Sequence, residues 1–279
     1  MEILLFMQEN PLILALETSG RKGSIAIAKG REVLAQTEFT AQIKHSAEIF
    51  PAISRLLQQL NQRPRQIRQV CLSAGPGSFT GIRIAVTIAK TFHLANKAQI
   101  VSVSSLDVIA SNVINLTPAI DKRSPNSDRQ TTTNYERLAV VLDAKRGQFF
   151  IAVYEKKTGE RQATSGDEMW EKTLPDCLMT PSQLLSVFAA LRRDECQFSV
   201  SDKSIALIGE GLVYHKEKFD SPHVQLLDER YWYPSAKNVL YIGLQKAREN
   251  QFADPASLLP NYLRTPDVKL KTTDTIEGS

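Results

Sequence analysis

The chain has 279 residues, of which 42% are apolar and 23% are charged, a composition typical of a globular protein with one large domain or two smaller lobes. Its formal net charge of +4 is compatible with a nucleic acid nearby but does not require one. No stripe of Lys and Arg interleaved with aromatic residues indicates an RNA-binding surface.

Cysteine usage and the N-terminal segment indicate a protein of the reducing cytosol. The three cysteines, Cys71, Cys177 and Cys196, are far apart and odd in number, so neither a disulfide framework nor a zinc knuckle is expected. The N-terminal segment carries Glu2 where a signal peptide needs basic residues, and it lacks a small-residue cleavage site. No apolar run is long enough to span a bilayer, so we expect a cytoplasmic protein without membrane contact.

Apolar runs separated by glycine turns predict that the chain opens with a meander of three strands. The strands are expected at 12–16, 24–28 and 33–39, and the first one ends in Glu17. A helix follows, because apolar residues then recur at helical spacing: Ile49, Ile53, Leu56 and Leu57.

The stretch 73–83 reads Ser-Ala-Gly-Pro-Gly-Ser-Phe-Thr-Gly-Ile-Arg and predicts a sharp corner between a strand and a helix. Ser78 or Thr80 can cap this helix. A glycine turn that opens a helix can hold an anion, but the spacing fits neither a P-loop nor G-x-G-x-x-G, so a structural corner is favoured. The small residues Gly81, Ala85 and Ala89 form a stripe that would let another helix approach closely.

The middle of the chain predicts a strand at 99–103 and then a helix through Leu116, capped by Ser104 or Ser105. Residues 117–135 are polar and predict an exposed inserted loop. The second half predicts strands around 168–174 and at 205–208, helices at 182–191 and 235–249, and a turn at Gly209-Glu210-Gly211.

The opening pattern recurs at 138–154. There a second apolar strand runs into Asp143, turns through basic residues and glycine, and returns as a hairpin. One unit used twice predicts two α/β lobes that face each other across a cleft, as in actin-like and sugar-kinase-like ATPases.

The repeat would bring two carboxylates, Glu17 and Asp143, to this cleft. They could hold Mg²⁺ through water beside a nucleotide, or they could end their strands and bond nearby N–H groups, which is the commoner role. The basic residues of the same turns could meet phosphate or be solvated turn residues: Arg21, Lys22, Lys145 and Arg146.

No complete catalytic set can be assembled from the sequence. The four histidines include no pair spaced three to five apart, as a helical metal site would need. No G-x-S-x-G elbow occurs, and Cys71 lies in an apolar strand, where a core role is expected.

The motifs, taken together, resemble the TsaB (YeaZ) family of tRNA threonylcarbamoyladenosine biosynthesis. The segment 75–83, Gly-Pro-Gly-Ser-Phe-Thr-Gly-Ile-Arg, is highly specific to this family. Weaker pieces occur in the right order: Leu14-Ala15-Leu16-Glu17-Thr18-Ser19, His45-Ser46, Val103-Ser104-Ser105-Leu106, Asp143-Ala144-Lys145-Arg146-Gly147 and Pro260-Asn261-Tyr262-Leu263-Arg264. The turn Arg21-Lys22 and the insertion at 117–135 differ from the usual pattern.

The resemblance implies a two-lobed actin-like fold (ASKHA, ribonuclease H-like and duplicated). The first lobe would span 11–104 plus 234–264, the second 105–233, and 265–279 would be a flexible tail. It also implies no catalysis by the chain itself. The catalytic relative, TsaD, carries a His-x-x-x-His metal pair where this chain has Ser105 and Ile109, which cannot replace it.

The resemblance implies that the chain binds and activates TsaD in the transfer of a threonylcarbamoyl group to the adenosine next to the anticodon of tRNAs reading codons that begin with A. TsaE would join the assembly, tRNA would be met indirectly through the complex, and a homodimer could form without TsaD. The implied partner interface lies on the first two helices: His45, Ile49, Ile53, Leu56, Leu57, Ser78, Phe79, Gly81, Arg83, Ala85 and Ala89.

The resemblance implies no cofactor and no metal of the chain's own, and ATP or ADP with Mg²⁺ would bind at the level of the complex. A vestigial nucleotide cleft would comprise Glu17, Thr18, Ser19, Asp143, Gly209 and Gly211. The alternative is an ATP-dependent phosphotransferase or ATPase of the actin-like class, based on the paired hairpins. A glycoprotease-type peptidase ranks last, since no nucleophile–base set supports it.

Overall fold

The computed structural model describes residues 11–40, 45–114, 135–157, 170–193 and 205–264. Most of the expected loop (117–134) and the expected tail (265–279) lie outside these residues. In the described part, none of the helices has the length and apolarity to span a bilayer.

The first sheet has five strands in the order β3-β2-β1-β4-β5. β1, β2 and β3 pair antiparallel as the expected meander, whereas β4 runs parallel to β1 and β5 parallel to β4. The strands are β1 (Leu12–Glu17), β2 (Lys22–Lys29), β3 (Glu32–Thr40), β4 (Ile67–Ser73) and β5 (Gln99–Val103).

The second sheet repeats this topology in the order β8-β7-β6-β9-β10. Again three antiparallel strands are followed by two that run parallel to the first. The strands are β6 (Arg137–Asp143), β7 (Phe149–Lys156), β8 (Trp170–Met179), β9 (Ile205–Ile208) and β10 (Val224–Leu226). The internal repeat is therefore confirmed, and the fold is the expected two-lobed α/β architecture of the actin-like type.

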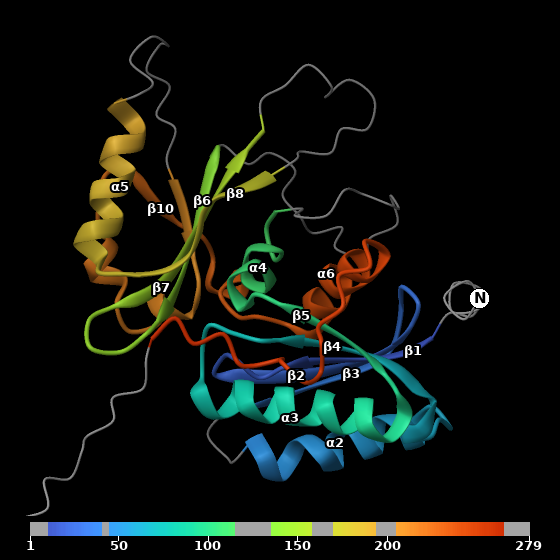
Figure 1. Ribbon diagram of the computed structural model, residues 1–279. Helices are drawn as coiled ribbons and strands as arrows, with labels where there is room; N and C mark the ends of the chain where they lie inside the picture. The colour runs from blue at the N-terminus through green and yellow to red at the C-terminus, as the bar shows by residue number, and fades with distance from the viewer. Residues whose placement is uncertain (1–10, 41–44, 115–134, 158–169, 194–204, 265–279) are drawn as a thin grey trace, which may run out of the picture.

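Helices cover both faces of the first sheet. α2 (His45–Gln59) and α3 (Phe79–Asn96) lie on one face, and α6 (Ala236–Arg248) lies on the other (Figure 1). α4 (Ser105–Ala110) lies against β6 and α6, between the two sheets. In the second lobe α5 (Pro181–Arg193) buries Leu184 and Phe188 in the core of that lobe.

β1 shows why its sequence is a continuous apolar run. Leu14 and Leu16 pack in the cluster beneath α2 and α3, while Ile13 and Ala15 pack in the cluster beneath α6. Side chains alternate between the faces of a strand, so a sheet covered on both sides needs apolar residues at every position.

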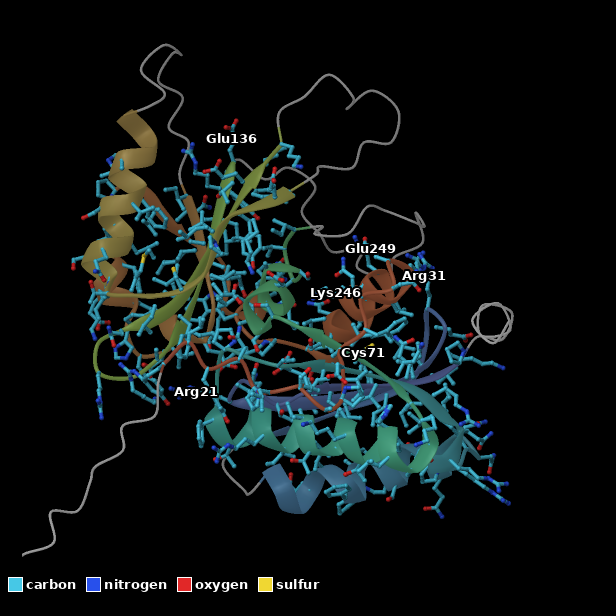
Figure 2. The ribbon with its side chains drawn as sticks, viewed as in Figure 1. Arg21, Arg31, Cys71, Glu136, Lys246 and Glu249 are labelled. Atoms are coloured by element: carbon cyan, nitrogen blue, oxygen red, sulfur yellow. The ribbon has the colours of Figure 1, made fainter. Side chains whose placement is uncertain are left out.

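Cys71 on β4 is fully buried between the first sheet and α6 (Figure 2). Its Sγ atom lies 2.5 Å from where a Cβ at Gly243 would be, so α6 approaches the sheet closely at that glycine. Burial raises the pKa of the Cys71 thiol to about 12, and the expected core role is confirmed.

Serine caps open three of the helices. Ser78 Oγ accepts the N–H of Gly81, so Ser78 is the cap of α3 and Thr80 lies inside the helix. Ser104 caps α4 and Ser235 caps α6 in the same way.

Two expectations of the middle segment are wrong. The helix after β5 ends at Ala110 and not at Leu116, because turns replace it from Ser111 onward. Tyr135 was expected at the end of an exposed loop but is 5% exposed and packs against Trp170, with ring centroids 5.9 Å apart.

Candidate functional site

The carboxylate of Glu17, at the end of β1, is fully buried in the first lobe. One of its oxygens accepts the N–H and the hydroxyl of Ser19, both at 2.6 Å, and the other accepts the hydroxyl of Ser73. Burial raises the pKa of Glu17, although these hydrogen bonds oppose the shift. Both oxygens of Glu17 therefore bind groups of the protein itself.

The glycine corner presses against the turn that follows Glu17. Thr18 Oγ1 donates to the carbonyl of Gly81 at 2.7 Å, and the N–H of Ser78 donates to the carbonyl of Ser19 at 2.7 Å. A Cβ atom at Gly81 would collide with the carbonyl oxygen of Thr18. Glycine at 81 thus lets α3 start directly against the β1–β2 turn.

The motif at 260–264 also meets the glycine corner, although more than 170 positions separate them in the sequence. The N–H of Asn261 donates to the carbonyl of Ala74 at 2.7 Å. The ring of Tyr262 stacks on that of Phe79 with centroids 4.8 Å apart, and Arg83 Nε donates to Tyr262 Oη at 2.8 Å. The guanidinium of Arg83 also lies 3.7 Å from the centroid of the Phe79 ring.

Most residues of the expected partner interface belong to the chain's own core. The apolar face of α2 and the small stripe of α3 pack against the first sheet and are buried, as are Ile49, Ile53, Leu56, Leu57, Gly81, Ala85 and Ala89. The expectation that these side chains contact a partner helix is therefore wrong. Periodicity identified the apolar face correctly, but the chain's own sheet covers it.

Other expected interface residues do lie on the surface. Ser78, Phe79 and Arg83 are exposed, and Phe79 retains 41% of its surface. Phe50, on the outer side of α2, was not singled out and is 52% exposed. His45 begins α2, but its side chain lies outside the described residues.

Glu210 is buried where the two lobes meet. This residue follows β9 and is 5% exposed, and its carboxylate accepts the backbone N–H of Arg21 from the first lobe at 2.9 and 3.0 Å. The repeat predicts that Glu17 and Asp143 lie together. In the structure the charge of Glu17 acts on Glu210, and it raises the pKa of that residue.

Asp143 is engaged elsewhere, in the turn after β6. Its oxygens accept the backbone N–H and the ammonium of Lys145, both at 2.7 Å, and one lies 4.0 Å from Nε2 of His215. Burial alone would raise the pKa of Asp143, but the hydrogen bonds from Lys145 outweigh it and lower that pKa.

Gly209 and Gly211 face β6 and β7. Gly209 has a φ of +121°, and a Cβ there would collide with the carbonyl oxygen of Val141. A Cβ at Gly211 would lie 2.9 Å from the ring of Phe149. Close packing inside the second lobe thus accounts for both glycines, and a nucleotide contact at either stays a prediction.

α4 holds the positions where TsaD was expected to carry its histidine pair. Ser105 and Ile109 are both fully buried. Among the described residues, no three His, Cys, Asp or Glu side chains are grouped so that they could hold a metal ion.

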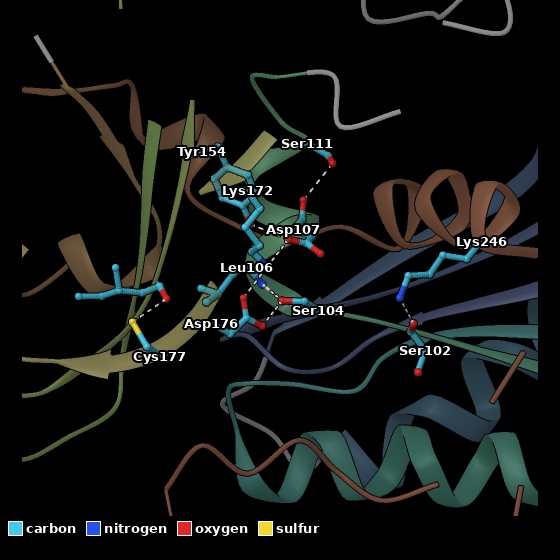
Figure 3. Close-up of polar contacts among 11 residues, drawn as sticks. Ser102, Ser104, Leu106, Asp107, Ser111, Tyr154, Lys172, Asp176, Cys177 and Lys246 are labelled. Atoms are coloured by element: carbon cyan, nitrogen blue, oxygen red, sulfur yellow. Dashed lines mark hydrogen bonds and ion pairs between the residues drawn. The ribbon is translucent and has the colours of Figure 1, made fainter. Parts of the chain in front are cut away.

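A charged network that the sequence did not reveal ties α4 to the second sheet (Figure 3). Lys172 on β8 places its ammonium 2.6 Å from Asp107 and 2.5 Å from Asp176. Tyr154 donates its hydroxyl to Asp107 at 2.6 Å, and Ser104 donates to Asp176 at 2.6 Å. These residues are up to 72 positions apart, so no local pattern could bring them together.

A family model described as "TsaD: tRNA N6-adenosine threonylcarbamoyltransferase" matches residues 31–271. The chain belongs to this family. Within it, the chain is 25% identical over 266 residues to "tRNA threonylcarbamoyladenosine biosynthesis protein TsaB" of Bacillus subtilis, which covers 93% of this chain and 96% of the relative. It is also 25% identical to the Escherichia coli protein of that name, over 90% of this chain and 94% of the relative.

A solved structure, "YeaZ from Pseudomonas aeruginosa", has the same fold as this member of the TsaD family. It superimposes with a TM-score of 0.65 at 19% identity and covers 91% of this chain and all of the solved chain. The resemblance to TsaB and YeaZ expected from the motifs is confirmed by these matches. The most specific motif, 75–83, forms the corner, where Thr18 bonds to Gly81 and Asn261 bonds to the preceding Ala74.

Proposed function

We propose that the chain is a non-catalytic subunit that binds a TsaD-type partner and activates it. The reaction would be the transfer of a threonylcarbamoyl group to the adenosine next to the anticodon of tRNAs reading codons that begin with A. The observation that carries the proposal is the surface cluster of Phe79, Arg83 and Tyr262. Phe79 and Arg83, from the family's most specific motif, are exposed and pack with the half-buried ring of Tyr262, and aromatic and arginine residues dominate protein interfaces.

The interior between the lobes favours this binding role over the alternative of an ATPase. The oxygens of Glu17 and the hydroxyls of Thr18 and Ser19 already bind protein groups. Glu210 lies on the backbone of the hairpin turn where an actin-like ATPase would grip phosphate. ATP or ADP with Mg²⁺ would then bind at the level of the complex.

The contact surface in this proposal is the outer side of α2 and α3. Phe50, Phe79 and Arg83 take the place of the buried residues first expected there, and His45 and Ser78 remain candidates. In the absence of TsaD the same surface would support a homodimer, and TsaE would join the larger assembly. The complex would work in the cytoplasm.

Size-exclusion chromatography with light scattering tests the proposal, using the full chain mixed with TsaD from the same organism. Wild type is expected to form a mixed species, and Phe79→Ala combined with Phe50→Glu is expected to abolish it. Leu226→Glu, on β10 of the second lobe, is the matched control, because Leu226 is an exposed apolar residue (38%) far from α2 and α3.

The transfer reaction is then measured on tRNA with TsaD, with and without the chain. Stimulation by wild type and by Leu226→Glu, but not by the double variant, is the expected result. The proposal is overturned if TsaD neither binds the chain nor gains activity from it. Magnesium-dependent ATP turnover by the chain alone, lost in Glu17→Ala, would support the ATPase alternative.

A further inference from the structure

Three separate segments bring their basic residues together where the two lobes meet. The turn after β1 contributes Arg21, whose guanidinium lies 4.2 Å from the centroid of the Tyr214 ring in the second lobe. His215, which follows Tyr214 in the chain, places its Nε2 atom 4.0 Å from a carboxylate oxygen of Asp143. Asp143 in turn accepts the ammonium of Lys145. The β1–β2 turn, the β6–β7 turn and residues 214–218 therefore adjoin one another, with Arg21 at the edge of the first lobe (Figure 2).

The segment 214–218 adds two further cations. Lys218 Nζ lies 5.9 Å from the centroid of the Phe149 ring, and the edge of His215 meets the same ring at 5.4 Å. Lys216 Nζ lies 4.8 Å from the centroid of the Trp232 ring. We call the whole surface the basic rim; its members are Arg21, Lys22, Lys145, Arg146, His215, Lys216 and Lys218.

Four cations of this rim, Arg21, Lys22, Lys216 and Lys218, lie over aromatic rings. Asp143 is bound by Lys145, and Glu210 is buried against the N–H of Arg21. Glu217 and Asp220 are the carboxylates of the 214–220 segment that face solvent. Tyr214 stands among the cations with 63% of its surface exposed, although Arg21 lies over its ring.

The chemistry of this rim fits a phosphodiester backbone better than a single nucleotide. Glu210 is buried against the β1–β2 turn, where a nucleotide's phosphate would be gripped, whereas the cations lie on two turns and on the segment 214–218. Several cations beside an exposed aromatic ring are the combination that binds RNA, because the cations neutralise phosphates and the ring stacks on an unpaired base.

We propose that the basic rim binds RNA directly, with the cations on the phosphates and Tyr214 as a stacking platform. This inference rests on the proposed function, since the RNA would be the tRNA on which the partner acts. It goes further than the indirect contact first expected, because here the chain itself holds the substrate.

Fluorescence anisotropy with a labelled anticodon stem-loop RNA tests the inference, on the chain alone and on its complex with TsaD. The test variant is Lys216→Glu combined with Lys218→Glu, and Tyr214→Ala is a second variant that leaves the charges unchanged. The matched control is Lys29→Glu combined with Arg65→Glu. Both control residues are exposed and lie at the opposite end of the first sheet, where Lys29 and Ile67 pair with Leu12.

The rim variant is expected to lose at least about tenfold in affinity, and the slope of log K against log salt should fall by about 2, one unit for each lysine. The control should stay within about twofold of wild type, and melting curves confirm that all variants fold. Equal losses in rim and control variants, no loss in the rim variant, no salt-dependent binding at all, or full competition by Mg-ATP would each overturn the inference. Complex formation with TsaD is scored in the same samples, so failure of the proposed function is recognised separately.

Discussion

Glu210 in the second lobe holds the backbone N–H of Arg21 in the first lobe with both carboxylate oxygens, at 2.9 and 3.0 Å. Gly20 permits this approach, because a Cβ there would collide with Glu210 and would lie 2.9 Å from Pro234. The charged and titratable groups that act on Glu210 from the surrounding elements are Glu17, Arg21, Lys22 and Tyr233. The contact joins the lobes through a carboxylate that has lost most of its water.

This contact predicts a pH dependence of stability. Burial raises the pKa of Glu210 to about 7; the N–H of Arg21 opposes the shift and the charge of Glu17 adds to it. The folded state therefore binds the proton more tightly than the unfolded chain. Its contribution to stability is complete below about pH 4.5 and is lost as pH rises through about 7.

Glu210→Gln keeps an oxygen for the N–H of Arg21 but cannot ionise. Between pH 4.5 and 7 we expect its melting temperature to fall less with rising pH than that of wild type. Above pH 7 it should be the more stable protein, by on the order of 1–3 kcal/mol. Scanning calorimetry across this range is the measurement, with the exposed Glu217→Gln as control, and parallel curves for wild type and Glu210→Gln would refute the prediction.

Gly81→Ala should destabilise the chain strongly, although alanine is the better helix former. The added Cβ would collide with the carbonyl oxygen of Thr18, a backbone atom that cannot move aside cheaply. We expect a loss of about 2–4 kcal/mol in urea unfolding, within the range for overpacking and lost buried hydrogen bonds. Gly147→Asn is the control, since a Cβ there meets nothing within 4 Å and asparagine tolerates its φ of +74°. Similar losses in both variants would contradict the steric explanation.

Phe79 and Tyr262 should be energetically coupled through their stacked rings. A double-mutant cycle of Phe79→Ala and Tyr262→Ala is expected to give a coupling free energy of about 0.5–1.5 kcal/mol in denaturant unfolding. Phe50→Ala with Tyr262→Ala should be additive, because Phe50 stands on a different helix. A coupling of zero for the first pair would mean that the surface cluster is not ordered in solution.

Lys172→Met should leave Asp107 and Asp176 as uncompensated neighbours. Their side chains are 24% and 13% exposed, so the loss should be about 1–3 kcal/mol, below that of a fully buried triad. Adding Asp107→Asn and Asp176→Asn to this variant should restore much of the stability in urea unfolding. No recovery in the triple variant would show that Lys172 acts by packing and not by charge.

The sequence was most informative where one local rule decides the structure. Apolar runs with turn residues predicted the strands from β1 to β9, the repeat of the hairpin predicted the second sheet, and serine caps marked the starts of α3 and α4. β10 was missed, because a strand of three residues leaves no pattern to read.

The site was less predictable, because its geometry depends on what covers each surface. The stripe of Gly81, Ala85 and Ala89 has the same sequence whether it faces a partner helix or the chain's own sheet, and the structure shows the latter. Glu210 and Arg21 are 189 positions apart, and no sequence rule joins them. The sequence singled out Arg21, Lys22, Lys145 and Arg146 in their two turns. It did not show that His215, Lys216 and Lys218, from a third segment, adjoin them.

The return of the chain to the first sheet has a consequence for its synthesis. α6 covers one whole face of that sheet, yet it begins only at Ala236, after all the strands of the second sheet have been made. A nascent chain leaving the ribosome must therefore hold the side chains of Ile13, Ala15 and Cys71 uncovered until α6 has emerged. Chains released before Ala236 would expose this apolar face, which makes premature termination a direct route to aggregation.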